Sequence, residues 1–341
     1  MSNSAAIIPE AKALLEVQNI GTSEPGPHEL LIKNELIALL PVDAKLAKLA
    51  FFPISYPAIL GTSYGGTVLA VGPNVTDFKV GDRVAAVKPG RVSGNKNGAF
   101  QKYVIALDVY AIKVPESTDL NIPVGLIGNF GTVVGLFYLR LGLGKPDPLG
   151  KAPSTGKKVL IYGGTSSFGS LAVQYVAQAG YDVVTTTSPK HSDFVSKLGA
   201  VHVVDHTQDH EKVVKELVAE GPYDVVVDSI SLKETFGITA KVVAAQGGRK
   251  LYALLPPSDP ESIPQGVDAE YKSWSAPLSE EKNAHILSWA YGSYFSLSVA
   301  KDKLVALPVR KINGGLGVLN EALDVLLNGV SGVKVVVDPR E

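Results

Sequence analysis

A strand, a glycine turn and a helix follow one another between residues 159 and 178, and no other part of the chain constrains its fold as strongly. Val159–Tyr162 is a short β-branched and aromatic run typical of a buried strand, it ends at Gly163-Gly164, and helix periodicity runs from Ser167 to Gln178. A helix that begins directly after such a turn presents free backbone N–H groups to an anion. The arrangement is typical of the pyrophosphate-binding turn of a dinucleotide-binding unit.

The glycine spacing alone is a weaker signal than its context. It is Gly164-x-Ser166-x-x-Gly169, with serine at the middle position of the usual fingerprint. A glycine turn between a strand and a helix is often only a turn. Here a strand precedes the turn, a helix follows it and further strand–helix units come after, so we predict a dinucleotide site.

The end of the next strand indicates which dinucleotide binds. An NAD-binding unit has an Asp or Glu about 20 residues after the glycine turn, where the carboxylate binds the ribose 2′-hydroxyl. In this chain the strand Tyr181–Thr187 is followed by Ser188-Pro189-Lys190-His191. Hydroxyls and cations suit a 2′-phosphate, which a carboxylate would repel, so we predict NADP(H). The alternative is that Lys190 and His191 are ordinary surface residues.

Composition excludes several classes of function. The chain has 341 residues, enough for two domains, and its 32 basic and 33 acidic side chains are interspersed. Because no phosphate-neutralising stripe is present, we expect no nucleic-acid partner. We also expect no apolar run that approaches the ~18 residues needed to span a bilayer. The start of the chain lacks the basic residue and apolar core of a signal peptide, so we predict a cytoplasmic protein without membrane contact.

Cysteine is absent from the sequence, which excludes disulfides, a thiolate nucleophile and Cys-ligated zinc. His202, His206 and His210 have a four-residue spacing that would suit metal ligation on a helix. Val201–Val204, however, is typical of a strand, so the three imidazoles would not share a face. We predict no metal site.

The sequence changes character near residue 126. Before it, short β-type runs lie between Gly/Pro turns, which favours an all-β, barrel-like unit. After it, strands alternate with helices, which favours a parallel sheet with right-handed crossovers. We expect the tail, 308–338, to pack on the N-terminal domain. The main predicted elements are strands at Leu30–Leu36, Thr67–Val71, Arg83–Val87, Val183–Thr187, Asp224–Asp228 and Lys250–Leu254, and helices at Asn129–Leu143, Lys233–Ala245 and Glu281–Asp302.

Motifs along the whole chain match one superfamily in order and spacing. They are Pro41-Val-Asp43-Ala-Lys45, Tyr56-Pro-Ala-Ile-Leu-Gly61, Gly65-Gly66-Thr-Val, Val80-Gly-Asp-Arg-Val84, Asn97-Gly-Ala-Phe100, Gly163 to Gly169, Gly247-Gly248-Arg249 and Gly329-Val-Ser-Gly332-Val-Lys334. On these residues the chain resembles the medium-chain dehydrogenase/reductase superfamily, and more narrowly its zinc-free quinone oxidoreductase and enoyl reductase branch. Within that branch it is most similar to the fungal toxD-like proteins and the trans-acting enoyl reductases that partner polyketide synthases.

The resemblance implies an α/β fold with two domains. One is a GroES-like, β-rich substrate and catalytic domain over residues 1–125. The other is a Rossmann domain, a doubly wound parallel sheet, that binds NADP over residues 126–300. The segment 301–341 would return to the catalytic domain. Relatives occur as monomers and as homodimers, so the oligomeric state stays open.

Zinc is also excluded by the resemblance. Zinc-dependent members have a cysteine in the early substrate-domain loop and Gly-His-Glu before the glycine pair. This chain has Leu40-Pro41-Val42-Asp43 and Gly61-Thr62-Ser63 at those places. Without a Lewis acid, plain alcohol dehydrogenation is disfavoured. Hydride addition to an activated C=C bond or to a quinone depends less on a Lewis acid, because these acceptors are already polarised.

The same resemblance assigns residues to NADPH. The glycine turn would hold the pyrophosphate, the end of the second strand the 2′-phosphate, and segments near residues 43, 253 and 332 the nicotinamide half. The predicted cofactor contacts are Asp43, Lys45, Gly164, Thr165, Ser166, Ser167, Phe168, Gly169, Ser188, Lys190, His191, His206, Ala253, Leu254, Gly332 and Val333.

Catalytic residues are assigned in the same way. When a hydride adds to the β-carbon of an unsaturated carbonyl, the developing enolate needs a nearby donor and then a proton. Lys45 resembles a residue that would stabilise the enolate, and Thr132 one that would orient substrate or carboxamide. Asp43 would fix the local backbone or pair with Lys45. The alternative is that Lys45 is an exposed surface lysine. Tyr56, Tyr64 or water could deliver the proton.

These observations favour an NADPH-dependent reductase of α,β-unsaturated carbonyl compounds, with a place in fungal secondary metabolism and a polyketide synthase as the implied partner. A quinone or reactive-aldehyde reductase is the sibling alternative. A non-catalytic NADPH-binding regulatory or scaffold protein is the alternative of another class. It stays open because the family usually has asparagine where this chain has Leu40.

Overall fold

The computed structural model describes residues 2–90 and 94–341. The chain forms two compact units: unit 1 consists of residues 1–128 and 278–341, and unit 2 of residues 129–277. The predicted boundaries lay at residues 125 and 300. The segment 278–300 therefore groups with unit 1 rather than with the dinucleotide-binding unit.

Unit 2 is built on a parallel sheet with the strand order β11-β10-β9-β12-β13-β14. Its strands are β9 (Lys158–Tyr162), β10 (Asp182–Thr187), β11 (Ala200–Asp205), β12 (Val225–Asp228), β13 (Lys250–Ala253) and β14 (Asp268–Tyr271). In chain order this is 3-2-1-4-5-6, the order of the doubly wound dinucleotide fold. The predicted Rossmann architecture is confirmed.

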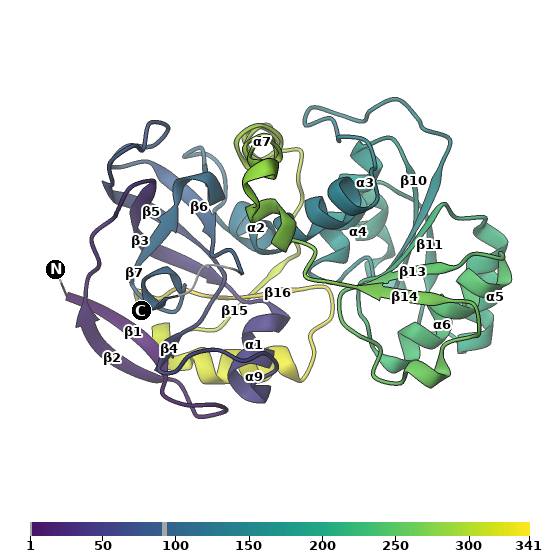
Figure 1. Ribbon diagram of the computed structural model, residues 1–341, viewed down its shortest axis with the longest axis horizontal. Helices are drawn as coiled ribbons and strands as arrows, with labels where there is room; N and C mark the ends of the chain where they lie inside the picture. Colours follow the sequence, from purple (N-terminus) through teal and green to yellow (C-terminus); the bar gives the residue numbers. More distant parts are fainter. Residues whose placement is uncertain (1, 91–93) are drawn as a thin grey trace. The chain divides into compact units, whose positions relative to one another are not determined.

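Helices cover both faces of this sheet. They are α3 (Gly169–Gln178), α4 (Ser192–Lys197), α5 (His210–Glu220) and α6 (Lys233–Ala245). Figure 1 shows α3 and α4 on one side of the strands and α5 and α6 on the other. A sheet covered on both faces explains the apolar run in its central strand β9, where Val159, Leu160 and Ile161 are fully buried.

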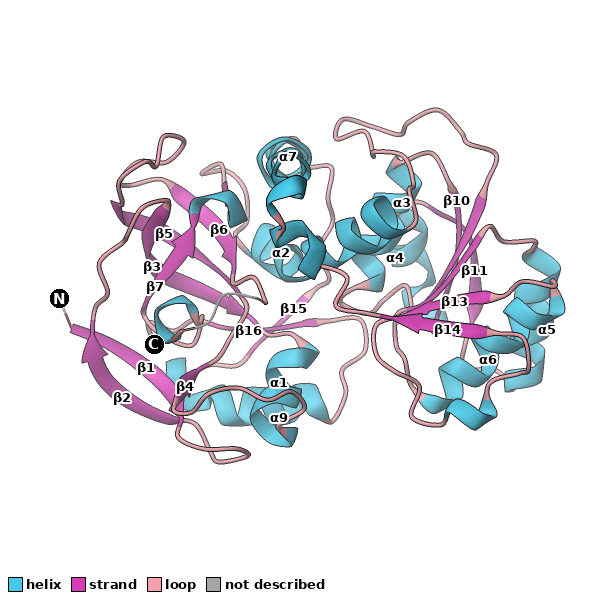
Figure 2. Cartoon of the chain, in the orientation of Figure 1, coloured by secondary structure: helices cyan, strands magenta, loops and turns pink. Residues whose placement is uncertain are grey.

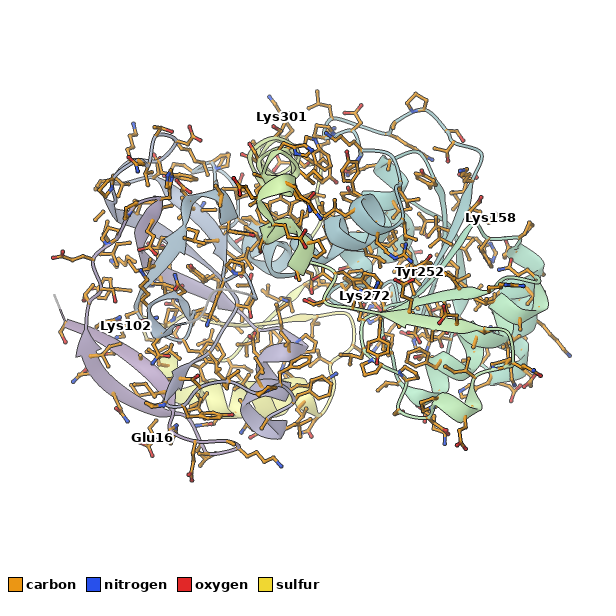
Figure 3. All side chains as sticks on the ribbon, viewed as in Figure 1. Glu16, Lys102, Lys158, Tyr252, Lys272 and Lys301 are labelled. Carbon is orange, nitrogen blue, oxygen red and sulfur yellow. The ribbon has the colours of Figure 1, made fainter. Side chains whose placement is uncertain are left out.

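The sequence analysis missed β14, the edge strand of this sheet. Its two end residues are exposed and its two middle residues half-buried, and its sequence Asp-Ala-Glu-Tyr has no apolar run. Trp274, just beyond it, donates its indole N–H to the carbonyl of Ala253 at 2.8 Å and packs edge-on against Tyr252, which Figure 3 labels. This pairing stabilises the end of β13.

The described residues of unit 1 form a seven-stranded sheet and a three-stranded sheet. The larger has the order β15-β16-β3-β5-β6-β8 with β7 paired to β3, and the smaller the order β2-β1-β4. The strands are β1 (Ser2–Ile8), β2 (Glu16–Gly21), β3 (Glu29–Ala38), β4 (Ala58–Ile59), β5 (Ser63–Val71), β6 (Arg83–Val87), β7 (Tyr103–Leu107), β8 (Ala111–Lys113), β15 (Val309–Lys311) and β16 (Lys334–Val337). The predicted β-rich unit is confirmed (Figure 2).

The C-terminal segment belongs to this β-rich unit. β16 pairs antiparallel with β3 and parallel with β15. Helix α9 (Leu319–Leu327) contacts α1 (Pro41–Leu49), and Lys48 on α1 forms an ion pair with Asp324 on α9 at 2.9 Å. The end of the chain therefore completes the large sheet and supports the helix that carries Lys45.

Helix α2 (Asn121–Val133) continues as a π-helical stretch, Val134–Arg140, so this helix begins at Asn121 rather than at the predicted Asn129. Pro123 is tolerated in its first turn. Gly128 allows close packing, because a Cβ there would lie 2.8 Å from Leu40 Cδ1. Asn121, Pro123 and Gly128 have low helix propensity, so the sequence pattern did not predict that the helix begins this early.

The expectation that no apolar stretch is long enough to span a membrane was wrong for this helix. Residues 121–140 are long and apolar enough to cross a membrane, and 67% of the most apolar window is buried in the fold. Burial on that scale is typical of a core helix.

The predicted helix at 281–302 is less regular than expected. It consists of α7 (Ala284–Leu287), a π-helical stretch (Ser288–Phe295) and α8 (Ser296–Ala300). Tyr291, Tyr294 and Phe295 on it are buried in unit 1, and the rings of Tyr110 and Tyr291 meet edge-on at 5.5 Å. These three aromatic side chains therefore belong to the core of unit 1.

Candidate functional site

The glycine turn after β9 is a backbone-lined loop with no room for additional side chains. A Cβ on Gly169 would lie 2.1 Å from the carbonyl oxygen of Gly163, and one on Gly164 would lie 2.5 Å from Thr185 Oγ1. Gly163 has a φ of +91°, which favours glycine. The turn therefore needs glycine at each of these positions. It leads into α3, where the backbone N–H of Ser170 donates to the carbonyl of Ser166 at 3.0 Å.

Hydroxyl groups hold this turn against neighbouring strands. Thr165 and Thr187 share a hydrogen bond at 3.0 Å, and Ser166 Oγ lies 2.9 Å from Ser229 Oγ. Ser166 Oγ also accepts the N–H of Gly169 at 2.8 Å. Serine at the middle fingerprint position thus replaces the glycine with a hydroxyl that caps the turn internally.

Two residues that the sequence analysis missed take part in this network. Ser229, directly after β12, donates its hydroxyl to the carbonyl of Tyr162 at 2.7 Å. Asn129 on α2 donates its amide to Ser167 Oγ at 2.9 Å. Ser229 could have been found, because β9 and β12 are adjacent parallel strands whose carboxyl ends share one edge of the sheet.

Asp228, at the end of β12, is buried and organises the loop that follows. Its carboxylate accepts the N–H groups of Ile230 and Ser231 at 2.9 Å each, and the hydroxyl of Thr235 at 2.7 Å. Burial raises the pKa of this carboxyl above its usual range. Ser231 Oγ in turn accepts the N–H of Leu254 at 3.0 Å, which places one predicted contact at the same sheet edge.

The end of β10 carries the residues predicted for the 2′-phosphate. Ser188 Oγ is buried and has no hydrogen-bond partner among the described residues. Lys190 is exposed and His191 half-buried, and both lie in the turn that leads into α4. His206 is exposed after β11, with its ring 6.4 Å from that of Tyr162. An orphaned hydroxyl beside two basic side chains fits an anionic group.

The remaining predicted contacts lie in both units. Phe168 is buried and stacks on Phe137 at 6.3 Å, so its side chain belongs to the core of unit 2 and only its backbone can face a ligand. Ala253 is buried at the end of β13. Gly332, with a φ of +63°, and Val333 precede β16 in unit 1.

Asp43 is a buried carboxylate in the first turn of α1. One oxygen accepts the N–H of Leu40 at 2.8 Å and the other accepts the hydroxyl of Thr62 at 2.8 Å. Burial raises the pKa of Asp43 to about 6, against the opposing effects of these hydrogen bonds and of the positive charges of Lys334 and Lys88. Its carboxylate therefore fixes the local backbone, one of the two predicted roles.

Lys45 lies two residues after Asp43 on the same helix and points in another direction, because residues two apart on a helix do not face each other. Its ammonium lies 5.6 Å from the centre of the Phe51 ring. Lys45 is half-buried, and burial lowers its pKa. Thr132, the second catalytic candidate, is half-buried on α2 in unit 2.

Two lysines near Asp43 escaped the sequence analysis as site residues. Lys334, at the start of β16, is only 3% exposed, and burial lowers its pKa to about 7. Lys88 follows β6, and burial lowers its pKa as well. Lys334 ends the quoted motif Gly329-Val-Ser-Gly332-Val-Lys334, but no local pattern places either lysine near Asp43, since both come from segments distant from residue 43.

The positions that hold zinc in zinc-dependent members do not fit the ion here. Leu40 is an apolar, buried side chain, and the hydroxyls of Thr62 and Ser63 already donate to Asp43 and to the carbonyl of Val124, the latter at 2.6 Å. Zinc prefers thiolate, imidazole and carboxylate ligands. Among the described residues, no group of three or more His, Asp or Glu side chains could hold a metal.

The two tyrosines considered as proton donors differ in their surroundings. Tyr64 is fully buried in unit 1, where its hydroxyl donates to the carbonyl of Ile105 at 3.3 Å and burial raises its pKa. Such a hydroxyl serves packing. Tyr56 is half-buried before Pro57.

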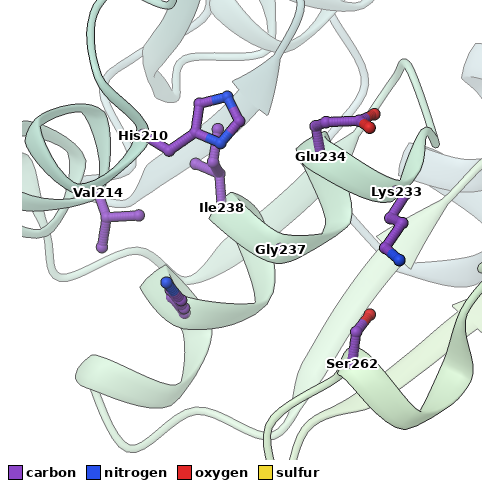
Figure 4. Close-up of a pocket in the computed structure, with 8 residues that line it drawn as sticks. His210, Val214, Lys233, Glu234, Gly237, Ile238 and Ser262 are labelled. Carbon is purple, nitrogen blue, oxygen red and sulfur yellow. The ribbon is translucent and has the colours of Figure 1, made fainter.

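A surface pocket on unit 2 lies between α5 and α6 (Figure 4). Its lining residues are His210, Val214, Lys233, Glu234, Gly237, Ile238, Lys241 and Ser262. No predicted site residue is among them, so the chemistry of the glycine turn does not extend to this pocket.

Comparison with known proteins identifies the family. Residues 26–116 match the alcohol dehydrogenase GroES-like domain, and residues 168–273 match the zinc-binding dehydrogenase domain. The chain is 32% identical to the dehydrogenase azaJ of Aspergillus niger, over 98% of this chain and 99% of that protein. The chain belongs to the medium-chain dehydrogenase/reductase family. This family member is an oxidoreductase, as the sequence motifs predicted.

Further comparisons place this reductase within the family. It is 32% identical to the trans-enoyl reductase himH of Aspergillus japonicus, over 98% of this chain and 97% of that protein. The solved structure of mycobacterial Rv1454c complexed with NADPH has a TM-score of 0.73 and 22% identity, over 99% of this chain and 100% of that chain. That likeness concerns the fold. The similarity to himH confirms the predicted resemblance to trans-acting enoyl reductases.

Proposed function

We propose that this reductase uses NADPH to reduce the activated C=C bond of an α,β-unsaturated carbonyl compound, without zinc. The observation that carries the proposal is the loss of the zinc donor set at Leu40, Thr62 and Ser63 in a chain whose dinucleotide turn is intact. A reductase without a Lewis acid is best suited to an acceptor that is already polarised. The name of the relative himH, a trans-enoyl reductase, supports the same reaction class.

The cofactor proposal rests on the chain's own residues. The turn from Gly164 to Gly169, lined by backbone and hydroxyls, suits a pyrophosphate. The buried, unpartnered hydroxyl of Ser188, with Lys190 and His191 beside it, suits a 2′-phosphate better than a free 2′-hydroxyl. NADPH, when bound, would supply the hydride. The NADPH complex of the structural relative supports this choice.

Lys45 and Thr132 are the proposed active-site side chains. Negative charge develops on the carbonyl oxygen of the substrate during reduction, and an ammonium near that oxygen would stabilise it. Half-burial of Lys45 strengthens such an interaction because fewer water molecules compete. Thr132 would orient the substrate or the carboxamide through its hydroxyl. We assign proton delivery to water, because Tyr64 donates to a backbone carbonyl in the core.

The proposed substrate is a small unsaturated carbonyl compound. A polyketide synthase that presents such a substrate on a carrier domain is the partner that the resemblance to trans-acting enoyl reductases implies. Free enones and carrier-bound thioesters share the same polarised C=C bond, so one active site could reduce both.

Binding and turnover test the proposal in sequence. NADPH is titrated by fluorescence with NADH as the control, and NADPH oxidation is then followed with enones, enoyl thioesters and quinones. We expect NADPH-selective binding and turnover of an enone or enoyl thioester. Turnover of quinones alone would support the sibling quinone reductase. Binding without turnover on any acceptor would support a scaffold role, and absence of binding would contradict the cofactor assignment.

A further inference from the structure

Lys334 is a buried lysine at the start of β16, and its backbone is held by neighbouring segments. Its backbone N–H donates to the carbonyl of Pro308 at 2.8 Å, and it pairs with Val309 of β15. Its side chain passes α2, where a Cβ on Gly125 would lie 3.8 Å from Lys334 Cγ. Lysine is rarely enclosed to this degree unless its charge is compensated.

Asp43 is a buried carboxylate whose negative charge attracts the positive charge of Lys334. It is 1% exposed, and the attraction between Asp43 and Lys334 shifts the pKa values of both in the direction that favours their charged forms. Half-buried Lys88 contributes a second positive charge toward Asp43. The buried carboxylate therefore balances lysines from two other segments of unit 1.

The strands connect the two residues through the start of α1. β16 pairs with the end of β3, with Val336 opposite Ala38. The next residue along, Leu39, donates its N–H to the carbonyl of Val335 at 3.0 Å. Asp43 then accepts the N–H of Leu40. Lys334 and Asp43 therefore lie on either side of the β3–α1 junction, immediately before the helix that carries Lys45.

We propose that Lys334 and Asp43 form a buried charge pair that fixes the first turn of α1, and that both are positioning residues for Lys45. The pair joins the segment that follows Gly332–Val333 to the helix of the proposed active-site lysine. The effect of the pair on catalysis rests on the role proposed above for Lys45. The effect of the pair on the rigidity of the start of α1 is independent of that role.

Four proteins test the pair: the wild type, Asp43→Asn, Lys334→Met and the double variant. Removal of one member deprives the other buried charge of this attraction, so each single variant should lose thermal stability. The double variant removes both buried charges of the pair and should recover much of that loss. Lys311→Met is the matched control, because Lys311 is an exposed lysine on the neighbouring strand β15, paired with Glu341.

Two readouts on the folded double variant separate positioning from stability alone. Amide hydrogen exchange over residues 41–49 should become faster than in the wild type. With an enone and saturating NADPH, kcat should fall by about 10- to 100-fold, as expected when a reacting group is misplaced. Lys311→Met should leave both readouts unchanged.

Three outcomes would overturn the proposal. Additive stability losses in the double variant would mean that the residues do not act as a pair. Unchanged exchange over residues 41–49 would mean that the pair does not hold α1. Unchanged kcat together with altered exchange would mean that the start of α1 does not position Lys45. If the wild type reduces no acceptor, the proposed function fails, and the stability and exchange measurements still decide whether the pair fixes α1.

Discussion

The dinucleotide turn of unit 2 and the start of α1 in unit 1 are built on different principles. The turn consists of backbone and hydroxyl groups from consecutive residues, Gly163 to Gly169, held by neighbours at one sheet edge. The start of α1 depends on a buried carboxylate and on lysines from distant segments, Lys88 and Lys334. A site made of backbone tolerates no added volume, whereas a site made of buried charges tolerates no uncompensated charge. The two regions should therefore fail under different perturbations.

The largest effect should come from adding volume to the turn. In Gly169→Val the new Cβ would lie 2.1 Å from the carbonyl oxygen of Gly163, so the turn must shift. We expect NADPH binding to be lost and stability to fall by roughly 1–3 kcal/mol, measured by fluorescence titration and thermal unfolding. Gly237→Ala on α6 is the matched control, because a Cβ there meets nothing within 4 Å. Retained NADPH affinity in Gly169→Val would contradict a backbone-built turn.

Removing the proposed active-site charge should leave the turn untouched. Lys45→Met should lower kcat for an enone by about 10²–10³-fold, the usual cost of removing one group that stabilises developing negative charge. NADPH affinity should stay near the wild-type value. The control is Lys48→Met, which removes a lysine from the same helix that pairs with Asp324. Equal kcat values for the Lys45 and Lys48 variants would mean that Lys45 has no catalytic role and is an ordinary surface lysine.

The stability of the protein should depend on pH through the buried charges of unit 1. The folded pKa of Asp43 is about 6 against 3.8 for the free group, so the folded state binds more protons and stability falls as pH rises from about 4 to about 6. The folded pKa of Lys334 is about 7 against 10.5, so stability rises with pH above about 7. At about 1.4 kcal/mol per pKa unit, each change amounts to a few kcal/mol.

This pH dependence is measured as the free energy of unfolding in denaturant, wild type minus Asp43→Asn/Lys334→Met. We expect a minimum of that difference between about pH 6 and pH 7, where both groups are charged. A flat difference would show that neither group titrates differently in the folded and unfolded states.

The smallest effects should occur at the end of β10. Ser188→Ala should weaken NADPH binding by about tenfold, since hydrogen bonds to charged groups contribute roughly 1.5–3 kcal/mol, and NADH binding should not change. Lys190→Ala should cost only a few-fold, and less at high salt, because its side chain is exposed. Lys197→Ala, exposed on α4, is the control. Equal losses for NADPH and NADH would contradict a role in cofactor selectivity.

The sequence predicted the dinucleotide unit in detail, because its signals are local. Lys233–Ala245 was predicted at its exact observed bounds, and β9 and β10 to within one residue at either end. Strand β14 was not predicted because it has no apolar run, and the start of α2 was not predicted because its residues have low helix propensity. Lys45 and Thr132 were proposed from resemblance alone, and their roles stay predictions.

Sequence by itself therefore determined the family, the parallel sheet and the glycine turn, because each depends on residues adjacent in the chain or on motifs in a set order. Only the tertiary structure decided that Asp43 and Lys334 are buried near each other, that Ser188 has an unsatisfied hydroxyl and that Ser229 supports the turn. Such contacts depend on strand order and burial. The contribution of a charge, a hydroxyl or an amide to stability depends on its burial and on its hydrogen-bond partners, and both are set by the tertiary fold.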